Sequence, residues 1–129
     1  MWDKPEEAVA FGIVLGAVER HGRIDVPLPP GPPFFRFSDA DESRRTLLGL
    51  GFKSPEVTVV PQVWRLESVD ALFEIMRNGT VRTAGLLRAQ TPTAQEAIRA
   101  DTRDAVRRYQ RGGGVELPMP AVLSSAIRS

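Results

Sequence analysis

The first strong hydrophobic pattern lies near the N-terminus, where apolar residues recur at intervals of three or four positions. The residues on this stripe are Ala8, Phe11, Leu15 and Val18. Such spacing is typical of one face of an α-helix. Asp3 can cap the start while Glu6, three residues later, completes a capping box. Gly22 can end the helix, since Arg20 and His21 in the last turn suit the helix dipole.

A proline-rich segment follows this helix. Arg23–Pro33 contains five prolines, which forbid a helix and favour extended backbone. Its interspersed apolar residues predict that it packs along the body of the protein. Phe34, Phe35 and Phe37 then surround Arg36, in a segment predicted to be short and extended. These rings either anchor the loop in the core or form the wall of a pocket.

A second helix and a strand are predicted on either side of Gly51. Ser38 or Asp39 can cap a helix over Ala40–Leu50. The face of this helix expected to be buried carries Leu47, Leu48 and Leu50. Val57–Leu66 reads as a strand with apolar residues on both faces, which indicates that both faces are covered. Pro61 inside it suggests a bulge or an edge position.

Helical patterns dominate the stretch between this strand and the C-terminus. One helix is predicted from Ser68 to about Asn78, and a shorter one near Thr83–Ala89. Thr93 and Glu96 form a capping box that opens a long helix ending at Arg111. Three glycines stop that helix, and Val115–Ser129 is predicted to be the final strand.

Composition limits the classes of protein to consider. The 129 residues are 42% hydrophobic and 26% charged, with a net charge of +1, as in an ordinary globular domain. No apolar run is long enough for a transmembrane helix, and the near-neutral charge does not favour nucleic acid as a partner. The absence of cysteine excludes disulfides and thiolate metal sites and fits a cytoplasmic location.

Candidate catalytic chemistry is sparse. His21 is the only histidine, so a two-histidine metal motif is impossible. Asp39, Asp41 and Glu42 form a carboxylate cluster, but helix capping explains it and no metal site is predicted. Gly112–Gly114 follows a helix and precedes a strand, which is the reverse of the order in a phosphate-binding loop.

One helix face is rich in arginine. Its members recur four positions apart and are Arg99, Arg103, Arg107 and Arg111. Asp101 and Asp104 lie on neighbouring faces. This stripe is either a solvated helix face or a surface that binds an anion or a partner.

Three segments together resemble a known enzyme family. They are a helix ending in Gly51-Phe52, a strand ending in Trp64-Arg65-Leu66, and the run from Leu117 to Leu123. The three segments occur in this order, and helices precede the last of them. This arrangement resembles the C-terminal part of class I (Rossmann-like) S-adenosylmethionine-dependent methyltransferases. The resemblance covers about Phe34–Ser129. It implies an α/β (α+β) fold with about five helices and a small antiparallel strand pair, at about 57–66 and 115–128.

The resemblance also implies what this chain does not contain. The glycine-rich loop and the ribose-binding acidic residue of the family belong to a first half that is absent here, so no cofactor-binding residue is assigned and no catalytic residue is identified. We therefore expect a single domain over residues 1–129, made of an N-terminal portion (1–37) and a methyltransferase-like portion (38–129). Its expected function is to supply the acceptor side of a methyltransferase, with S-adenosylmethionine bound elsewhere and the isolated chain inactive.

Two alternatives to this function stay open. The chain could be a non-catalytic interaction or dimerisation module derived from the same fold, or a protein that binds an apolar small molecule. The residues expected to line an apolar substrate pocket are Phe34, Phe35, Trp64, Phe73 and Met76; plain core packing explains them equally well.

The last strand carries a prediction about partners. The resemblance implies that this strand has a neighbour on each side, one of which this chain lacks. Ala121–Ile127 would then expose a mostly apolar edge. We expect the Phe34–Phe37 segment, a second copy of the chain or a separate cofactor-binding chain to cover it.

Overall fold

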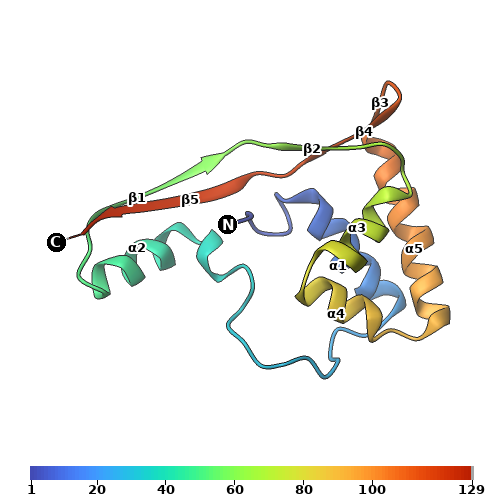
Figure 1. Ribbon diagram of the computed structural model, residues 1–129, viewed down its shortest axis with the longest axis horizontal. Helices are drawn as coiled ribbons and strands as arrows, with labels where there is room; N and C mark the ends of the chain where they lie inside the picture. Colours follow the sequence, from blue (N-terminus) through green and yellow to red (C-terminus); the bar gives the residue numbers. More distant parts are fainter. Residues whose placement is uncertain (129) are drawn as a thin grey trace.

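The computed structural model describes residues 1–128 and has a mixed α+β architecture. Within these residues it contains five α-helices and two small antiparallel sheets (Figure 1). Most of the helices gather in one body, and a long two-stranded ribbon, β1 (Lys53–Val60) with β5 (Ala121–Ile127), extends away from it. The mixed α+β class expected from the sequence is confirmed.

Helix α1 (Val9–His21) begins later than the capping pattern predicts. The Asp3 carboxylate accepts a hydrogen bond from the Lys4 amide at 2.8 Å, and Glu6 does not complete a capping box. The reason is a tertiary contact. The amide of Asp3 donates to the carbonyl oxygen of Pro120, so residues 1–3 pair with the C-terminal part of the chain and do not begin the helix. The predicted end of the helix at Gly22 is correct.

The proline-rich segment is extended and packs along the helical body, as predicted. The side chain of Gln90 forms two hydrogen bonds with the backbone of Arg23. It accepts from the N–H of Arg23 at 2.8 Å and donates to the carbonyl oxygen of Arg23 at 2.7 Å. Arg82 donates to the carbonyl oxygen of Pro29 at 3.1 Å. The phenylalanines that follow are not extended, because Arg36–Ser38 forms a short 3₁₀ helix, η1.

Helix α2 (Ala40–Gly49) is capped by Asp39, whose carboxylate accepts from the Glu42 amide at 2.8 Å. The prediction that it buries Leu47, Leu48 and Leu50 is wrong for the last two, while Leu47 is half-buried. Leu50 is 70% exposed and Leu48 is also exposed, whereas Ser43 is buried. The helix lies along the ribbon and outside the main body, so a large part of its apolar face lacks a covering layer (Figure 1).

The predicted strand pairing is correct, but each predicted strand is divided in two. β1 (Lys53–Val60) pairs with β5 (Ala121–Ile127), and β2 (Val63–Leu66) pairs with β4 (Gly114–Pro118), in both cases antiparallel. The short β3 (Gln110–Arg111) flanks β4.

Prolines account for the division. Pro61 lies between β1 and β2, Pro120 lies between β4 and β5, and neither has an N–H to donate to a ladder. The amide of Met119 donates to the carbonyl oxygen of Gln62 at 2.8 Å, so the two halves stay in contact across the break. Ser129, the end of the predicted strand, lies outside the described residues.

The expectation that both faces of the first strand are covered is also wrong. Val59 shares one face with Val57 and lines a hollow with residues at the start of α2. Thr58 and its partner Leu123 therefore point to the opposite face, where Leu123 is 58% exposed. The ribbon thus has α2 against one face and an open second face.

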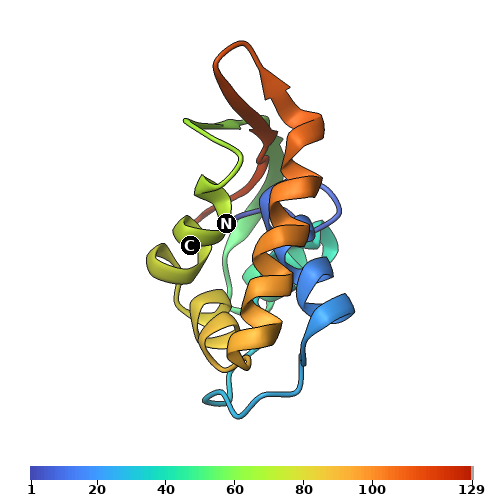
Figure 2. The same cartoon turned by 90° about the vertical axis from the view of Figure 1, so that its right-hand side faces the viewer.

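The core lies among the helices and under β2 and β4. Helices α3 (Ala71–Gly79) and α4 (Arg82–Arg88) confirm two predicted helices, and α5 (Pro92–Val106) continues into a 3₁₀ turn, η2 (Arg107–Tyr109). Helix α5 lies between α1 on one side and α3 and α4 on the other (Figure 2). The large side chains that meet in this core are Phe11, Leu72, Phe73, Met76, Leu87, Ile98, Leu117 and Met119.

The start of α5 differs from the predicted capping box at Thr93 and Glu96. Thr91 is the cap, and its hydroxyl accepts from the Ala94 amide at 3.2 Å. Pro92 occupies the first helical position, where its missing N–H costs nothing.

Two leucine substitutions test where the core ends. Leu87→Ala, at a fully buried position, is expected to lower the free energy of unfolding by about 2–5 kcal/mol because it leaves a cavity. Leu50→Ala, on the exposed end of α2, is expected to change it by less than about 0.5 kcal/mol. Denaturant unfolding followed by circular dichroism measures both. Equal losses would mean that α2 is buried as the sequence pattern predicts.

Candidate functional site

An apolar hollow lies beside the N-terminus, where the ribbon joins the helical body. Its volume is about 470 Å³. Residues from distant parts of the chain line it, and they are Met1, Trp2, Phe34, Gln62 and Ala121. The volume is within the range of small-molecule sites, which are mostly apolar with a few polar groups. Here the polar side chain is that of Gln62.

Three of the residues predicted to line a pocket lie at or behind this hollow. Phe34 lines it directly. Phe35 packs edge-on against Phe34, with ring centroids 4.8 Å apart, and both rings contact Phe11 in the core. Trp64 meets Trp2 edge to face, with centroids 5.3 Å apart, and so supports a wall of the hollow from behind.

The other two predicted pocket residues lie in the core. Phe73 is 1% exposed and Met76 is fully buried, and neither lines the hollow. The Arg99 guanidinium lies 4.4 Å from the centre of the Phe73 ring, so this ring takes part in helix packing. Phe73 and Met76 are therefore core residues, as the core-packing alternative predicts.

Sequence reasoning missed the N-terminal contribution to this site. Met1 and Trp2 reach the hollow because Trp2 forms an isolated antiparallel bridge with Ala121. Three backbone hydrogen bonds fix this register: Met1 N–H to Val122 O at 2.8 Å, Val122 N–H to Met1 O at 2.7 Å and Asp3 N–H to Pro120 O at 3.0 Å. A pairing between residues more than a hundred positions apart has no local signal, although an isolated tryptophan next to the N-terminus is a hint.

The same pairing decides how the edge of β5 is covered. The N-terminal residues cover its first part. The Phe34–Phe37 segment lies near β5, since η1 contacts this strand, but it forms no backbone pairing with it. From Leu123 to Ile127, no backbone group within residues 1–128 pairs with the side of β5 that faces away from β1. Ile127 is 63% exposed. This stretch, Leu123–Ile127, is called the free edge below.

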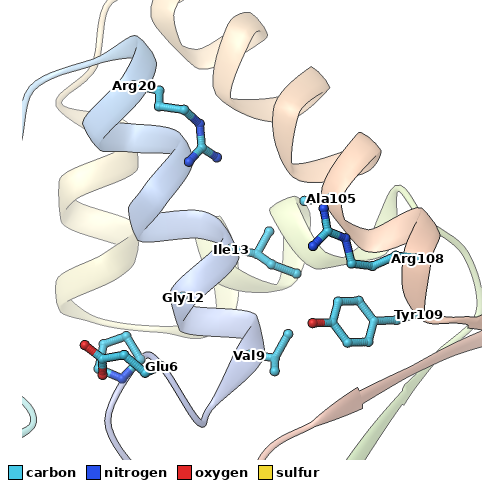
Figure 3. A pocket seen from close by; sticks show the side chains of 9 residues that line it. Glu6, Val9, Gly12, Ile13, Arg20, Ala105, Arg108 and Tyr109 are labelled. Carbon is cyan, nitrogen blue, oxygen red and sulfur yellow. The ribbon is translucent and has the colours of Figure 1, made fainter.

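A second hollow, of about 300 Å³, is the groove between α1 and the end of α5. Val9, Gly12 and Ile13 from α1 form one wall, and Arg108 and Tyr109 from η2 lie opposite (Figure 3). A Cβ at Gly12 would collide with the carbonyl oxygen of Pro5, so glycine lets the turn at Pro5 lie against α1.

An ion pair crosses this groove at its far end. The Nε of Arg20 lies 2.8 Å from a carboxylate oxygen of Asp101, and the Nε2 of His21 lies 2.8 Å from the same oxygen. The hydrogen bond from Arg20 is the main cause that holds the pKa of Asp101 below its ordinary value. The contact with His21 lowers this pKa further, whereas partial burial of the carboxylate raises it. The pair therefore fastens α1 to α5.

The arginine stripe on α5 is largely occupied by ion pairs. Arg99 pairs with Glu74 and Arg103 pairs with Asp70, both carboxylates coming from α3 or its start. Arg107 lies 3.4 Å from Asp104. The hydrogen bond from Arg99 lowers the pKa of Glu74. These contacts anchor α5 to α3 and do not favour the stripe as an anion-binding surface.

The remaining candidates yield no metal site or phosphate site. Within residues 1–128, no group of three or more histidine, cysteine or acidic residues is placed to hold a metal ion. Gly112 has a φ of +58° in the turn between β3 and β4, a connection that needs glycine for its backbone conformation. No helix in the described part of the chain is long and apolar enough to cross a membrane.

Comparisons of the chain with protein-family models, with characterised proteins and with solved structures find no match. A function therefore has to be inferred from three local features of this chain. These are the apolar hollow, the free edge of β5 and the groove between α1 and α5.

The ion pair across the groove generates a prediction about pH. Because the pKa of Asp101 is lowered in the folded state, its contribution to stability is present above the ordinary carboxyl pKa and is lost as the pH falls through the lowered value. Asp101→Asn is expected to lower the free energy of unfolding by about 0.5–1 kcal/mol near pH 7, since the Arg20 side chain is half exposed to screening solvent. This difference is expected to shrink below a pH of about 4.

Urea unfolding of both proteins at a series of pH values measures this difference. Asp25→Asn is the control, because Asp25 pairs with Arg23 at the surface and both side chains are exposed. The hydrogen bond from Arg23 also lowers the pKa of Asp25, but solvent screens this exposed pair, so a smaller pH-dependent loss than in Asp101→Asn is expected for the control. A loss in Asp101→Asn that stayed constant into the acid range would contradict the assignment.

Proposed function

We propose that this chain is the acceptor-binding C-terminal portion of a class I S-adenosylmethionine-dependent methyltransferase. Two features of the fold support the proposal. β1 pairs antiparallel with β5, and helices α3, α4 and α5 are inserted between these strands along the chain. The antiparallel pairing and the inserted helices both agree with the fold implied by the resemblance at Gly51–Leu66 and Leu117–Leu123.

The observation that carries the proposal is the free edge of β5. A two-stranded ribbon is marginally stable by itself in water, and strands become independently stable in sheets of three or more. Met1–Asp3 adds a third strand for only a short distance and runs antiparallel to β5. A separate strand in line with Met1–Asp3 could pair with Leu123–Ile127. We assign this position beside β5 to a strand of the cofactor-binding half.

The residues of this chain do not themselves fit the cofactor. The Gly112–Gly114 turn joins β3 to β4, and no helix begins there to present its N-terminal amides. S-adenosylmethionine would supply the methyl group in the assembled enzyme, bound by residues outside this chain. No step of the transfer is therefore assigned to a residue described here.

The part proposed for this chain is to hold the methyl acceptor and exclude water. Methyl transfer depends mainly on the relative position of donor and acceptor. The apolar hollow at Met1, Trp2 and Phe34 lies at the start of the β5 edge, so an acceptor bound in it would be next to a docked cofactor-binding half. Its apolar walls suit an acceptor with an apolar body.

A non-catalytic dimerisation module is the second candidate, and the same free edge favours it. In that case the strand that pairs with Leu123–Ile127 belongs to a second copy of the chain. The two candidates differ in what occupies the edge. The cytoplasmic location expected from the absence of cysteine suits both.

The first prediction from this proposal concerns the cofactor. The isolated chain is expected not to bind S-adenosylmethionine or S-adenosylhomocysteine at micromolar concentrations, because residues 1–128 contain no strand–glycine loop–helix unit. Isothermal titration of the purified chain measures this. Saturable binding with a dissociation constant of about 10 μM would refute the proposal that the cofactor is bound by a separate half of the enzyme.

The complementary experiment restores the other half. The coding sequence immediately upstream, or an adjacent gene, is expected to encode a strand, a glycine-rich loop and a helix. Co-expression with that product should give a stable complex that binds S-adenosylmethionine. If neither place encodes such a segment, the methyltransferase proposal fails and the dimerisation module becomes the better candidate.

Ser124→Pro tests the free edge directly. The N–H and C=O of Val122 face the N-terminal strand, so by alternation those of Ser124 also face away from β1. Proline there removes a donor from the free edge but none from the β1 ladder. The change is expected to weaken the complex with the cofactor-binding half at least about tenfold. Ser125→Pro is the contrast, because its N–H faces β1 and its loss should unfold the ribbon.

Analytical ultracentrifugation with hydrogen exchange follows both variants. For the methyltransferase proposal, the isolated chain sediments as a monomer and the amides of Ser124 and Ala126 are unprotected until the partner is added. A dimer of the chain alone, dissociated by Ser124→Pro, would instead identify a second copy as the occupant.

A further inference from the structure

We propose that the groove between α1 and the end of α5 binds a small organic carboxylate. The carboxylate would lie on Arg108 and Tyr109, and its aromatic or branched aliphatic body would lie on Val9 and Ile13 (Figure 3). This inference does not depend on the proposed methyltransferase function, because the groove is a different site from the apolar hollow.

Arg108 carries an unpaired charge. The arginines of α5 and its 3₁₀ extension otherwise have carboxylate partners, since Arg99, Arg103 and Arg107 each form an ion pair. Arg108 forms no ion pair and no side-chain hydrogen bond with any residue from 1 to 128. Its guanidinium instead projects into the space between the two helices (Figure 3). A guanidinium offers a planar fork of donors that matches a carboxylate.

Tyr109 places its hydroxyl in the same groove. The ring is half buried and packs against the core, and the hydroxyl points across the groove towards Val9 (Figure 3). Within the described residues this hydroxyl has no hydrogen-bond partner. It is therefore able to donate to an anion held by the adjacent Arg108.

The other charged groups around the groove do not compete for the guanidinium of Arg108. The Nε of Arg20 donates to Asp101, and the Nη1 of Arg20 lies over Gly16. Asp101 is already paired with Arg20 and His21. Among the described residues that line the groove, only Glu6 carries a carboxylate, and it lies beyond Gly12, at the end opposite to Arg108 (Figure 3).

Size and lining indicate the rest of the ligand. The groove has a volume of about 300 Å³, at the lower end of the range for small-molecule sites. Val9, Ile13 and Ala105 supply apolar walls. A single unpaired guanidinium suits a monovalent carboxylate better than a phosphate, and the apolar walls suit a body of the size of a benzene ring.

The experiment is a nuclear magnetic resonance titration of the full chain with three probes, benzoate, 3-phenylpropanoate and isovalerate. Saturable shifts are expected at the amides of Val9, Gly12, Ile13, Arg108 and Tyr109 for at least one acid. Benzamide, the neutral analogue of benzoate, is expected to bind at least about tenfold more weakly, because it lacks the charge-assisted hydrogen bonds. Inorganic phosphate is expected to leave the amides of Val9 and Ile13 unshifted.

Two variants make the test specific. Arg108→Gln is expected to weaken binding at least about tenfold, and Tyr109→Phe by about three- to tenfold. Arg111→Gln is the matched control, because Arg111 is also exposed and without an ion pair in the described chain but does not line the groove. Its affinity should equal that of the unmodified chain. Thermal unfolding of each variant establishes that it is folded.

Two outcomes would overturn the proposal. One is the absence of saturable shifts with all three acids up to about 20 mM. The other is an equal loss of affinity in Arg108→Gln and Arg111→Gln, which would show that the acids bind surface arginines in general.

Discussion

The structure depends on the backbone junction around Met119, where the strands, the N-terminus and helix α1 meet. The amide of Met119 donates to the carbonyl oxygen of Gln62 at 2.8 Å and holds the two sheets together between their prolines. Its sulfur accepts the amide of Ala10 at 3.3 Å, and its side chain is fully buried. The next carbonyl oxygen, that of Pro120, accepts the amide of Asp3. The ribbon, the helical body and the N-terminal residues thus share one anchor.

From this junction the chain divides into two environments with different degrees of burial. β2 and β4 lie against the helices, and Leu117 is fully buried among them. β1 and β5 extend away from the main helical body, with α2 and η1 as the helical elements that contact them in the described chain. The core therefore stabilises one part of the sheet, whereas the other part keeps an open face and a free edge. Exposed apolar strands are costly to leave unpaired, because they promote association. This cost is the physical reason to look for a partner there.

The arginines of α5 illustrate how position decides the role of a charge. Arg99 and Arg103 face α3, whose carboxylates neutralise them and tie the helices together. Arg108 follows in η2 and lines the groove against α1, where it forms no ion pair within the described chain. The same residue type therefore serves packing on one face and offers a free guanidinium on another. The four-residue spacing in the sequence leaves Arg108 off the stripe, but it does not reveal which arginines find a carboxylate.

The sequence by itself determined the kinds of element and their order. Hydrophobic spacing, the Asp39 cap and the stops at Gly22 and Gly51 are local signals, because a helix is set by contacts between residues three or four positions apart. The Phe34–Phe35 cluster was recognised for the same reason, since its apolar surface is concentrated within a few residues. The antiparallel strand pairing followed from the resemblance to methyltransferases.

Only the tertiary structure decided which apolar faces are buried. Leu48 and Leu50 have the spacing of a buried face, yet no layer lies over that end of α2. Phe73 and Trp64 are both large and aromatic, but one lies in the core and the other supports the hollow. The hollow itself depends on Trp2 pairing with Ala121, and the groove depends on α1 packing beside α5 and η2. Burial is a property of what packs over a face, and for these faces the packing partner is distant in the sequence.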